Sequence, residues 1–222
     1  MEKDTKYIFD MDGTLYHFDA IAGTTFHNSR FCRDLIQRTY SYLSSQLELD
    51  LVAATELVED IQTRYDGHLS LGLEKEHNIS RDELFSATWD CDPAQYLVAE
   101  PSLAETMSIF RGRSALLTAA PRVWADRVLA YLGIADVFED RIFTGEPDIR
   151  KPDPRAFEVV ARSLGADAPE IISVGDQNHT DILPALKLGM RTAIIGPDKQ
   201  DAHFRADTVL DLLPQLIERK LL

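Results

Sequence analysis

Short apolar runs and segments of helical periodicity alternate along most of the chain. An apolar run of four or five residues rich in β-formers predicts a buried strand, and apolar residues three and four positions apart predict an amphipathic helix. Strands that alternate with helices favour a parallel sheet covered on both faces, so we predict an α/β fold. The predicted strands are 6–9, 115–118, 140–144, 171–174 and 192–195, and the predicted helices are 101–111, 121–132, 154–164, 181–188 and 212–221, with a further short element beginning at Val209.

The segment 24–88 has a different pattern, because it is helical and contains no convincing strand. Ser80 followed by Glu83 is typical of a capping box at the start of one helix. Two earlier helices are predicted by apolar residues at helical spacing, which are Phe31, Leu35, Ile36, Tyr40 and Leu43 in the first and Leu51, Thr55, Leu57, Val58 and Ile61 in the second. The predicted domains are a helical insert, 19–94, and a discontinuous core, 1–18 and 95–222.

Two carboxylates, Asp10 and Asp12, directly follow the first predicted strand. Side chains alternate along a strand, so the pair could lie on one face, and Gly13 would let the chain turn away. In open α/β sheets, ligands bind beyond the carboxyl ends of the strands. Such a pair can hold a hard cation and supply both a nucleophile and a proton donor. An acidic turn without chemistry is the alternative, whereas a calcium loop is excluded because its glycine and glutamate positions hold Leu15 and Ile21.

Polar residues form three further motifs after the acidic pair. A second strand ends in Thr118, and Lys151 precedes a helix that starts with proline. A third strand ends in Asp176, with Asp181 five residues later. This ordered set of four motifs resembles the haloacid dehalogenase superfamily of phosphatases, and the resemblance covers nearly the whole chain. It implies a Rossmann-like core with an inserted helical cap, a Mg²⁺ cofactor, and hydrolysis of phosphomonoesters through an aspartyl phosphate.

The resemblance also implies a role for each of the four aspartates in these motifs. Asp10 is the expected nucleophile, and Asp12 is the expected acid that protonates the leaving oxygen and then activates water. Mg²⁺ is expected to bind Asp10, Asp176 and the backbone carbonyl of Asp12. Asp181 is expected to orient bound water rather than to contact the ion.

The other two motifs are expected to bind the phosphoryl group. By resemblance, Thr118 and nearby backbone N–H groups, with Ala119 among the neighbours, bind phosphoryl oxygens. Lys151 would balance the charge of the carboxylates and the phosphoryl group. The second acid, Asp12, favours phosphoryl chemistry, because the dehalogenases that name the superfamily do not use it. A phosphomutase shares this acid and stays an alternative.

A finer resemblance concerns the substrate. Asp12–Tyr16 and Tyr65–Leu73 resemble the opening and the cap of the pyrimidine 5′-nucleotidase branch, which makes nucleoside 5′-monophosphates the first substrate class. Ala119 and Gly175 depart from that branch, which usually has asparagine and glutamate there, and Gly175 with Asp176 resembles phosphoglycolate phosphatases instead. Small metabolites such as phosphoglycolate or sugar phosphates are therefore the alternative substrates. A binding or regulatory protein without turnover is the alternative from another class.

Recognition of the rest of the substrate is expected from the cap and the segment that leads into it. Aromatic rings could stack on a base, and Asn or His could hydrogen-bond its edge. The candidates, of which His17 and His68 are expected to bind substrate, are Tyr16, His17, Phe26, His27, Asn28, Tyr65 and His68. Packing within the cap is the alternative role for each of them.

Composition narrows the possible partners. A formal net charge of −14 over 222 residues argues against nucleic acid as a partner, because phosphate backbones select basic surfaces. No apolar stretch approaches membrane-spanning length and the N-terminus is charged, so we expect a cytoplasmic protein without a membrane partner. Cys32 and Cys91 lack zinc-site spacing and are expected to be reduced thiols. The expected partner is a small phosphorylated substrate, and the expected state is a monomer or homodimer.

Overall fold

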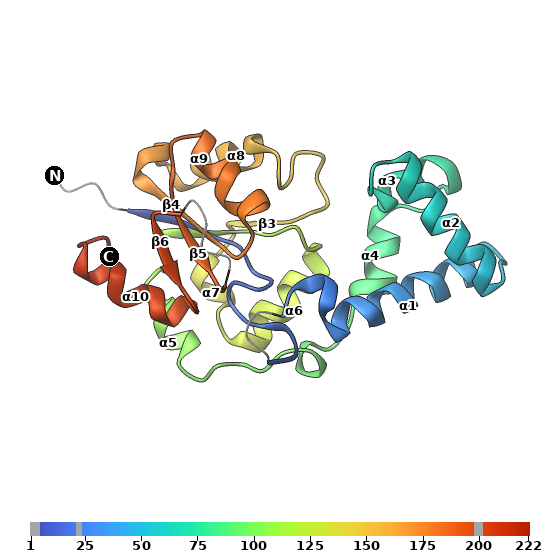
Figure 1. Cartoon of the computed structure of the whole chain (residues 1–222), viewed down its shortest axis with the longest axis horizontal. Helices are drawn as coiled ribbons and strands as arrows, with labels where there is room; N and C mark the ends of the chain where they lie inside the picture. Colours follow the sequence, from blue (N-terminus) through green and yellow to red (C-terminus); the bar gives the residue numbers. More distant parts are fainter. Residues whose placement is uncertain (1–4, 21–23, 198–201) are drawn as a thin grey trace. The chain divides into compact units, whose positions relative to one another are not determined.

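The computed structural model of the chain describes residues 5–20, 24–197 and 202–222. The chain divides into two compact units (Figure 1). The larger unit consists of Met1–Phe26 together with Pro93–Leu222, and the helical unit consists of His27–Asp92. The assignment of the helical unit as a substrate cap stays a prediction.

The larger unit contains a six-stranded sheet in which every neighbouring pair of strands is parallel. The strand order is β3-β2-β1-β4-β5-β6. The first strand of the sequence therefore lies in the middle, and the chain leaves it in both directions. The strands are β1 (Lys6–Phe9), β2 (Ser114–Leu117), β3 (Ile142–Phe143), β4 (Ile171–Gly175), β5 (Arg191–Ile195) and β6 (Phe204–Ala206).

Helices cover both faces of this sheet (Figure 1). One face carries α8 (Pro154–Leu164) and α9 (Leu183–Lys187). Phe157 of α8 and Ala185 of α9 belong to the same apolar cluster as Ile8 of β1. On the opposite face, the Phe110 ring lies edge-on to the rings of Tyr7 and Phe9, with centroids 4.7 and 5.0 Å away. The helices on that side are α5 (Leu103–Ser108), α6 (Arg122–Leu132), α7 (Ala135–Phe138) and α10 (Val209–Glu218). Successive side chains of β1 thus pack into two apolar cores, one on each face, as expected for a sheet buried on both faces.

The helical unit has its own apolar core. Its helices are α1 (Arg30–Gln46), α2 (Leu51–Arg64), α3 (Leu69–His77) and α4 (Arg81–Trp89). The side chain of Ser80 accepts from the backbone N–H of Glu83, whose carboxylate bonds back to Ser80, so the predicted capping box is present. The buried residues of this core are Leu43, Ala54, Val58, Ile61, Leu73, Ile79 and Leu84.

The predicted α/β class with a parallel, Rossmann-like sheet is confirmed, but three local predictions were wrong. The prediction of three helices missed α3, because Leu69, Leu71 and Leu73 alternate as they would in a strand. The sequence analysis also missed β6, whose three residues are too few to establish a pattern. Val209, predicted to begin a separate short element, is the first residue of α10. Tertiary packing decides these short elements, since Leu73 is fully buried in the core of the helical unit.

The third difference affects the region after β4. Asp181 was predicted to begin an α-helix, but it lies inside a π-helical turn, Asn178–Ile182, and α9 starts at Leu183. The backbone N–H of Asp181 bonds to the carbonyl of Gln177 at 3.0 Å. A π-turn places one more residue in the turn than an α-helix does, and such turns are frequent at functional sites.

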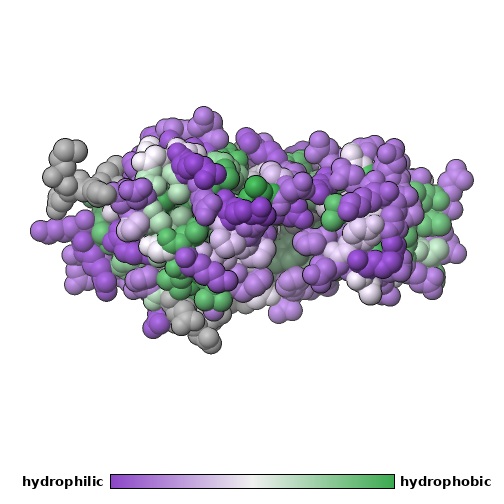
Figure 2. Space-filling model, turned by 90° about the horizontal axis from the view of Figure 1, so that it is seen from above, coloured by the Kyte–Doolittle hydropathy of each residue, from purple (hydrophilic) through white to green (hydrophobic). Residues whose placement is uncertain are grey.

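The face of the molecule seen in Figure 2 is predominantly polar. Figure 2 shows hydrophilic residues over most of the visible face, with hydrophobic residues in small separate patches. In the part of the chain that the structure describes, no helix is long and apolar enough to cross a membrane.

Phe157 provides a test of the packing between α8 and the sheet. Its side chain is fully buried, so Phe157→Ala should lower the free energy of unfolding by about 3–5 kcal/mol. Chemical denaturation followed by circular dichroism measures this loss. Glu158→Ala, an exposed change on the same helix, should stay within about 0.5 kcal/mol of the unaltered protein. Equal losses in the two variants would contradict the packing described.

Candidate active site

The motif residues meet at the carboxyl edge of the sheet because β1 lies between β2 and β4. Phe9 is paired with Leu116 on one side and with Val174 on the other. Asp10 follows β1, Thr118 follows β2 and Asp176 follows β4, so side chains far apart in sequence converge at one point. The structure therefore brings the motif residues together at the edge where open α/β sheets bind ligands.

Lys151 forms the ionic centre of this group. Its Nζ donates to Oδ1 of Asp10 at 2.7 Å and to Oδ1 of Asp181 at 2.5 Å, and the lysine side chain is only 2% exposed. Burial alone would lower the pKa of Lys151, but the two carboxylates outweigh it and hold this pKa above its ordinary value. The ammonium group therefore stays charged and offsets part of the negative charge around it.

Asp10 is fixed through both carboxylate oxygens. Oδ1 accepts from Lys151, and Oδ2 accepts from the hydroxyl of Thr14 at 3.0 Å. Burial raises the pKa of Asp10 to about 7, an effect that Lys151 opposes and that the charges of Asp181 and Asp12 reinforce. A carboxylate held in one orientation in a poorly solvated place suits a nucleophile better than a mobile, hydrated one.

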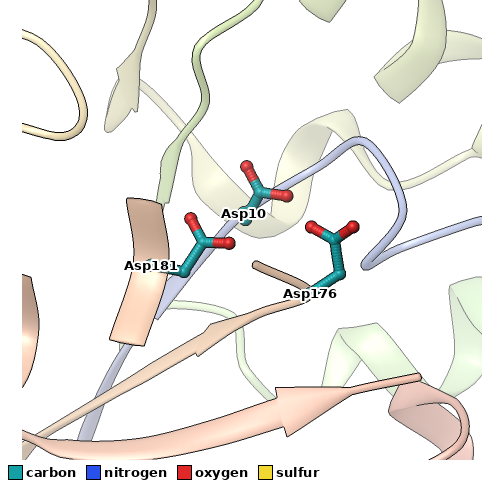
Figure 3. A group of neighbouring side chains, drawn as sticks. All are labelled: Asp10, Asp176 and Asp181. Carbon is teal, nitrogen blue, oxygen red and sulfur yellow. The ribbon is translucent and has the colours of Figure 1, made fainter. Parts of the chain in front are cut away.

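Three carboxylates lie close together in this site (Figure 3). One oxygen from each of Asp10, Asp176 and Asp181 lies within 4.8 Å of the others. Oδ1 of Asp176 is buried and has no hydrogen-bond partner within residues 5–20, 24–197 and 202–222. Burial, with the neighbouring charges of Asp10 and Asp181, raises the pKa of Asp176 to about 9. An unpaired buried carboxyl among hard oxygen donors fits a Mg²⁺ ligand, which would restore its ionised form.

Asp181 contributes differently from the other two acids. Its Oδ1 accepts from Lys151, and its Oδ2 accepts from the backbone N–H of Gln177 at 2.9 Å. The hydroxyl of Ser173 donates to its backbone carbonyl at 3.1 Å. Because both carboxylate oxygens already hold donors, this residue is suited to orienting Lys151, and its expected role toward bound water stays a prediction.

Two glycines allow the acids to approach so closely. A Cβ on Gly13 would lie 2.3 Å from Oδ2 of Asp176, and Gly13 also has a φ of +85° that disfavours any other residue. A Cβ on Gly175 would lie 2.3 Å from Cβ of Asp181. A larger residue at either position would push a carboxylate out of the group.

Asp12 has its own hydrogen-bond partners. Its Oδ1 accepts from the hydroxyl of Tyr16 and from Nε1 of Trp124, the latter at 3.0 Å. The hydroxyl of Thr118 lies 3.5 Å from Oδ2. Burial raises the pKa of Asp12, and these hydrogen bonds oppose that rise. Tyr16 was considered only as a specificity residue, and Trp124 was missed, although a tryptophan in the first turn of the helix after Thr118 is a usable signal.

Thr118 and Ala119 complete the edge at β2. Thr118 is fully buried, and its backbone N–H bonds to the carbonyl of Phe143 at 2.9 Å. Its hydroxyl accepts from the backbone N–H of Ala120 at 3.0 Å. Ala119 is exposed beside it. These positions agree with the expected phosphoryl-binding role, which stays a prediction.

The candidate specificity residues are divided between the two units. His17 is half-buried in the larger unit, where burial lowers its pKa, and it lines a pocket of about 250 Å³ with Tyr16, Val98 and others. Phe26 contacts the ring of Phe18, with centroids 6.0 Å apart. The four remaining candidates, His27, Asn28, Tyr65 and His68, belong to the helical unit, where all except the partly buried Tyr65 are exposed.

Tyr65 already has partners within the helical unit. Its hydroxyl donates to Glu76 at 2.8 Å, and the same carboxylate bonds to Arg64. For Asn28, it is the backbone carbonyl that accepts a hydrogen bond, from the Arg33 side chain at 3.2 Å. The structure thus gives Tyr65 a role in local packing, which was the alternative to base stacking.

A parallel sheet whose central strand ends in a buried carboxylate, held by a lysine beside further acids, defines a Rossmann-like hydrolase core. Residues 7–189 match the family model described as haloacid dehalogenase-like hydrolase, and the chain belongs to this family. The predictions of the superfamily and of an enzyme within it are confirmed.

Similar proteins fit this membership. A glyceraldehyde 3-phosphate phosphatase of Methanopyrus kandleri is 28% identical over 90% of this chain and 88% of its own. A haloacid dehalogenase-type phosphatase of Thermococcus onnurineus has a TM-score of 0.63 at 22% identity and covers 96% of this chain and 97% of its own. A 2-haloacid dehalogenase of Pseudomonas syringae pv. Tomato has a TM-score of 0.64 at 18% identity, covering 98% and 99%. The two structures share the fold across different chemistries, so the residues of the site decide the reaction.

Asp176 provides a test of the metal site that does not depend on turnover. Mg²⁺ should raise the melting temperature of the protein, since a ligand at 100 times its Kd stabilises the folded state by about 2.7 kcal/mol. Asp176→Asn should remove most of this shift, and Asp153→Asn, at the N-cap of α8, should keep it. A Mg²⁺ shift of the same size in Asp176→Asn would contradict the site.

Proposed function

We propose that this protein is a Mg²⁺-dependent phosphomonoester hydrolase that acts through an aspartyl phosphate. The observation that carries the proposal is the buried Lys151, which is held between Asp10 and Asp181. Beside it lies Asp176, whose buried Oδ1 has no hydrogen-bond partner in the described part of the chain. This arrangement offers an oriented nucleophile, a fixed positive charge and a cation site at one strand edge.

The first half-reaction transfers the phosphoryl group to the protein. A carboxylate oxygen of Asp10 attacks phosphorus and forms a new O–P bond as the P–O bond to the leaving alcohol breaks. Asp12 gives its proton to the leaving oxygen, so the product is a neutral alcohol and Asp12 becomes a carboxylate. Lys151 and Thr118 would hold the phosphoryl oxygens during this transfer.

The second half-reaction restores the enzyme. Asp12 removes a proton from water, and the resulting hydroxide attacks the phosphorus of the aspartyl phosphate. The O–P bond to Asp10 breaks, inorganic phosphate is released, and both aspartates return to their starting states. When bound by Asp10, Asp176 and the backbone carbonyl of Asp12, Mg²⁺ would neutralise charge between the nucleophile and the phosphoryl group.

The environment of Asp12 supports phosphoryl transfer rather than dehalogenation. A displaced halide needs no proton, whereas an alkoxide leaving group does. Asp12 lies beside Thr118, within 3.5 Å between Oδ2 and the threonine hydroxyl, where a leaving oxygen next to the phosphoryl group would be. Burial raises its pKa, which favours a protonated acid in the resting site.

A small phosphorylated metabolite is the first substrate class we propose. The similar phosphatase of Methanopyrus kandleri is named for glyceraldehyde 3-phosphate. Gly175 stands where pyrimidine 5′-nucleotidases usually have glutamate, and the Gly175–Asp176 pair resembles that of phosphoglycolate phosphatases. A glutamate side chain would have no room at this position because Asp181 lies against it. Nucleoside 5′-monophosphates are the second class, supported by the resemblance of Tyr65–Leu73 to pyrimidine 5′-nucleotidases.

Phosphate release from a panel of substrates tests the function and the class together. The panel contains p-nitrophenyl phosphate, glyceraldehyde 3-phosphate, phosphoglycolate, sugar phosphates and nucleoside 5′-monophosphates, each with and without Mg²⁺. We expect Mg²⁺-dependent turnover, with the highest kcat/KM on a small metabolite. A preference for nucleotides would favour the second class. Tight binding of a phosphorylated metabolite without any turnover would favour a binding protein.

Asp10→Asn should lower kcat by at least about a thousandfold, because the amide keeps the shape of the side chain and loses the attacking anion. The melting temperature should change little, since one buried charge is removed from a group of repelling acids. Phosphate release and circular dichroism measure the two quantities. Turnover near that of the unaltered enzyme would reject Asp10 as the nucleophile.

Asp12→Asn should separate substrates by their leaving groups. The value of kcat/KM, which reports the steps up to alcohol release, should fall about 10²–10⁴-fold for a primary alkyl phosphate. It should fall far less for p-nitrophenyl phosphate, whose leaving group needs little protonation. Equal losses on the two substrates would show that Asp12 is not the acid.

A further inference from the structure

Two buried donors from distant parts of the sequence meet on one oxygen of Asp12. Tyr16 lies in the turn after β1, four residues beyond Asp12, and Trp124 lies in the first turn of α6. The hydroxyl of Tyr16 and Nε1 of Trp124 both donate to Oδ1 of Asp12. The Trp124 side chain is fully buried, and Tyr16 is only 6% exposed. In neither case does bulk water compete strongly for the donor.

Aromatic packing restricts where these donors can point. The ring of Tyr16 lies edge-on to Phe18, with centroids 5.2 Å apart and an interplanar angle of 75°. The indole of Trp124 lies edge-on to Tyr96, with centroids 6.4 Å apart and an interplanar angle of 69°. Rings held in this way lose little further entropy when they bind the carboxyl group, so the two hydrogen bonds can fix its plane.

The geometry makes the two oxygens of Asp12 unequal. Oδ1 accepts two hydrogen bonds, which leaves it no suitable place for a proton of its own. Oδ2 accepts one longer hydrogen bond, from the hydroxyl of Thr118 at 3.5 Å, at the edge where the phosphoryl group is proposed to bind. Oδ2 is therefore the oxygen of Asp12 that has room to face a leaving group.

We propose that Tyr16 and Trp124 are positioning residues that cover Oδ1 of Asp12 and present Oδ2 to the leaving oxygen. This inference rests on the proposed function, in which Asp12 delivers a proton from that carboxyl group. Neither residue touches the reacting atoms. They restrict the Asp12 carboxyl group to the orientation in which its O–H points at the leaving group. The competing explanation is that Asp12 only satisfies two buried donors.

Leaving-group dependence separates these explanations. Tyr16→Phe and Trp124→Phe each remove one donor and keep an aromatic ring. For each variant, kcat/KM should fall roughly tenfold on a primary alkyl phosphate, a fraction of what an acid contributes, and less than about twofold on p-nitrophenyl phosphate. The Tyr16 change removes a single oxygen atom, so it tests the proposal even if Trp124→Phe disturbs packing. Equal losses on both substrates in Tyr16→Phe would overturn the proposal.

Tyr7→Phe is a matched control. Tyr7 is also fully buried in the larger unit, and its hydroxyl donates to the backbone carbonyl of Leu221, away from Asp12. Losing that hydroxyl should lower stability by about 1 kcal/mol without changing the ratio of kcat/KM between the two substrates. A changed ratio in this variant would show that lost stability alone causes the effect, and would overturn the proposal.

Asp12→Asn distinguishes failure of the inference from failure of the proposed function. If Asp12→Asn separates the substrates and Tyr16→Phe does not, the positioning role is wrong and the acid role stands. If Asp12→Asn fails to separate them, the acid role falls and the inference falls with it. Within Asp12→Asn, adding Tyr16→Phe should cause no further separation, because the proton it would position is absent.

Discussion

The whole site depends on one buried ammonium group. Lys151 contacts both Asp10 and Asp181 through Nζ, and without that charge three carboxylates would face one another in a poorly solvated place. Two acids cannot both stay ionised at such distances unless positive charge lies between or beside them. The lysine supplies part of that charge permanently, and a bound cation would supply the rest, so the proposed site would bind a cation and an anionic phosphoryl group together.

The division of labour among the acids follows from their neighbours. Asp10 is held by Lys151 and Thr14, Asp181 by Lys151 and a backbone N–H, and Asp12 by two aromatic donors. Asp176, in contrast, has a buried oxygen without a partner among the residues that the structure describes. Four aspartates of identical chemistry thus have different hydrogen-bond partners. Such separation of environments is how one site can contain an anion for attack and an acid for proton delivery.

The core of this arrangement could be predicted from the sequence because it depends on local patterns. The central strands are predominantly apolar, and the polar residues that end them, such as Asp10 and Asp176, stand in a recognisable order. The partners of Asp12 could not be predicted in the same way. Trp124 lies 112 positions from Asp12, and only the packing of α6 against the sheet brings its indole to that carboxyl group. Short elements such as β6 were missed for the same reason, since their neighbours decide them.

The central position of β1 has a consequence for how the chain folds. β1 is the first strand made, yet its hydrogen-bonding neighbours are β2 and β4, which begin at Ser114 and Ile171. During synthesis the apolar segment Tyr7–Phe9 has only half of its partners until most of the chain has emerged. Non-local pairing of this kind slows folding and leaves an unpaired strand edge exposed in the meantime. The first residues of the active site to be translated are thus among the last to reach their final contacts.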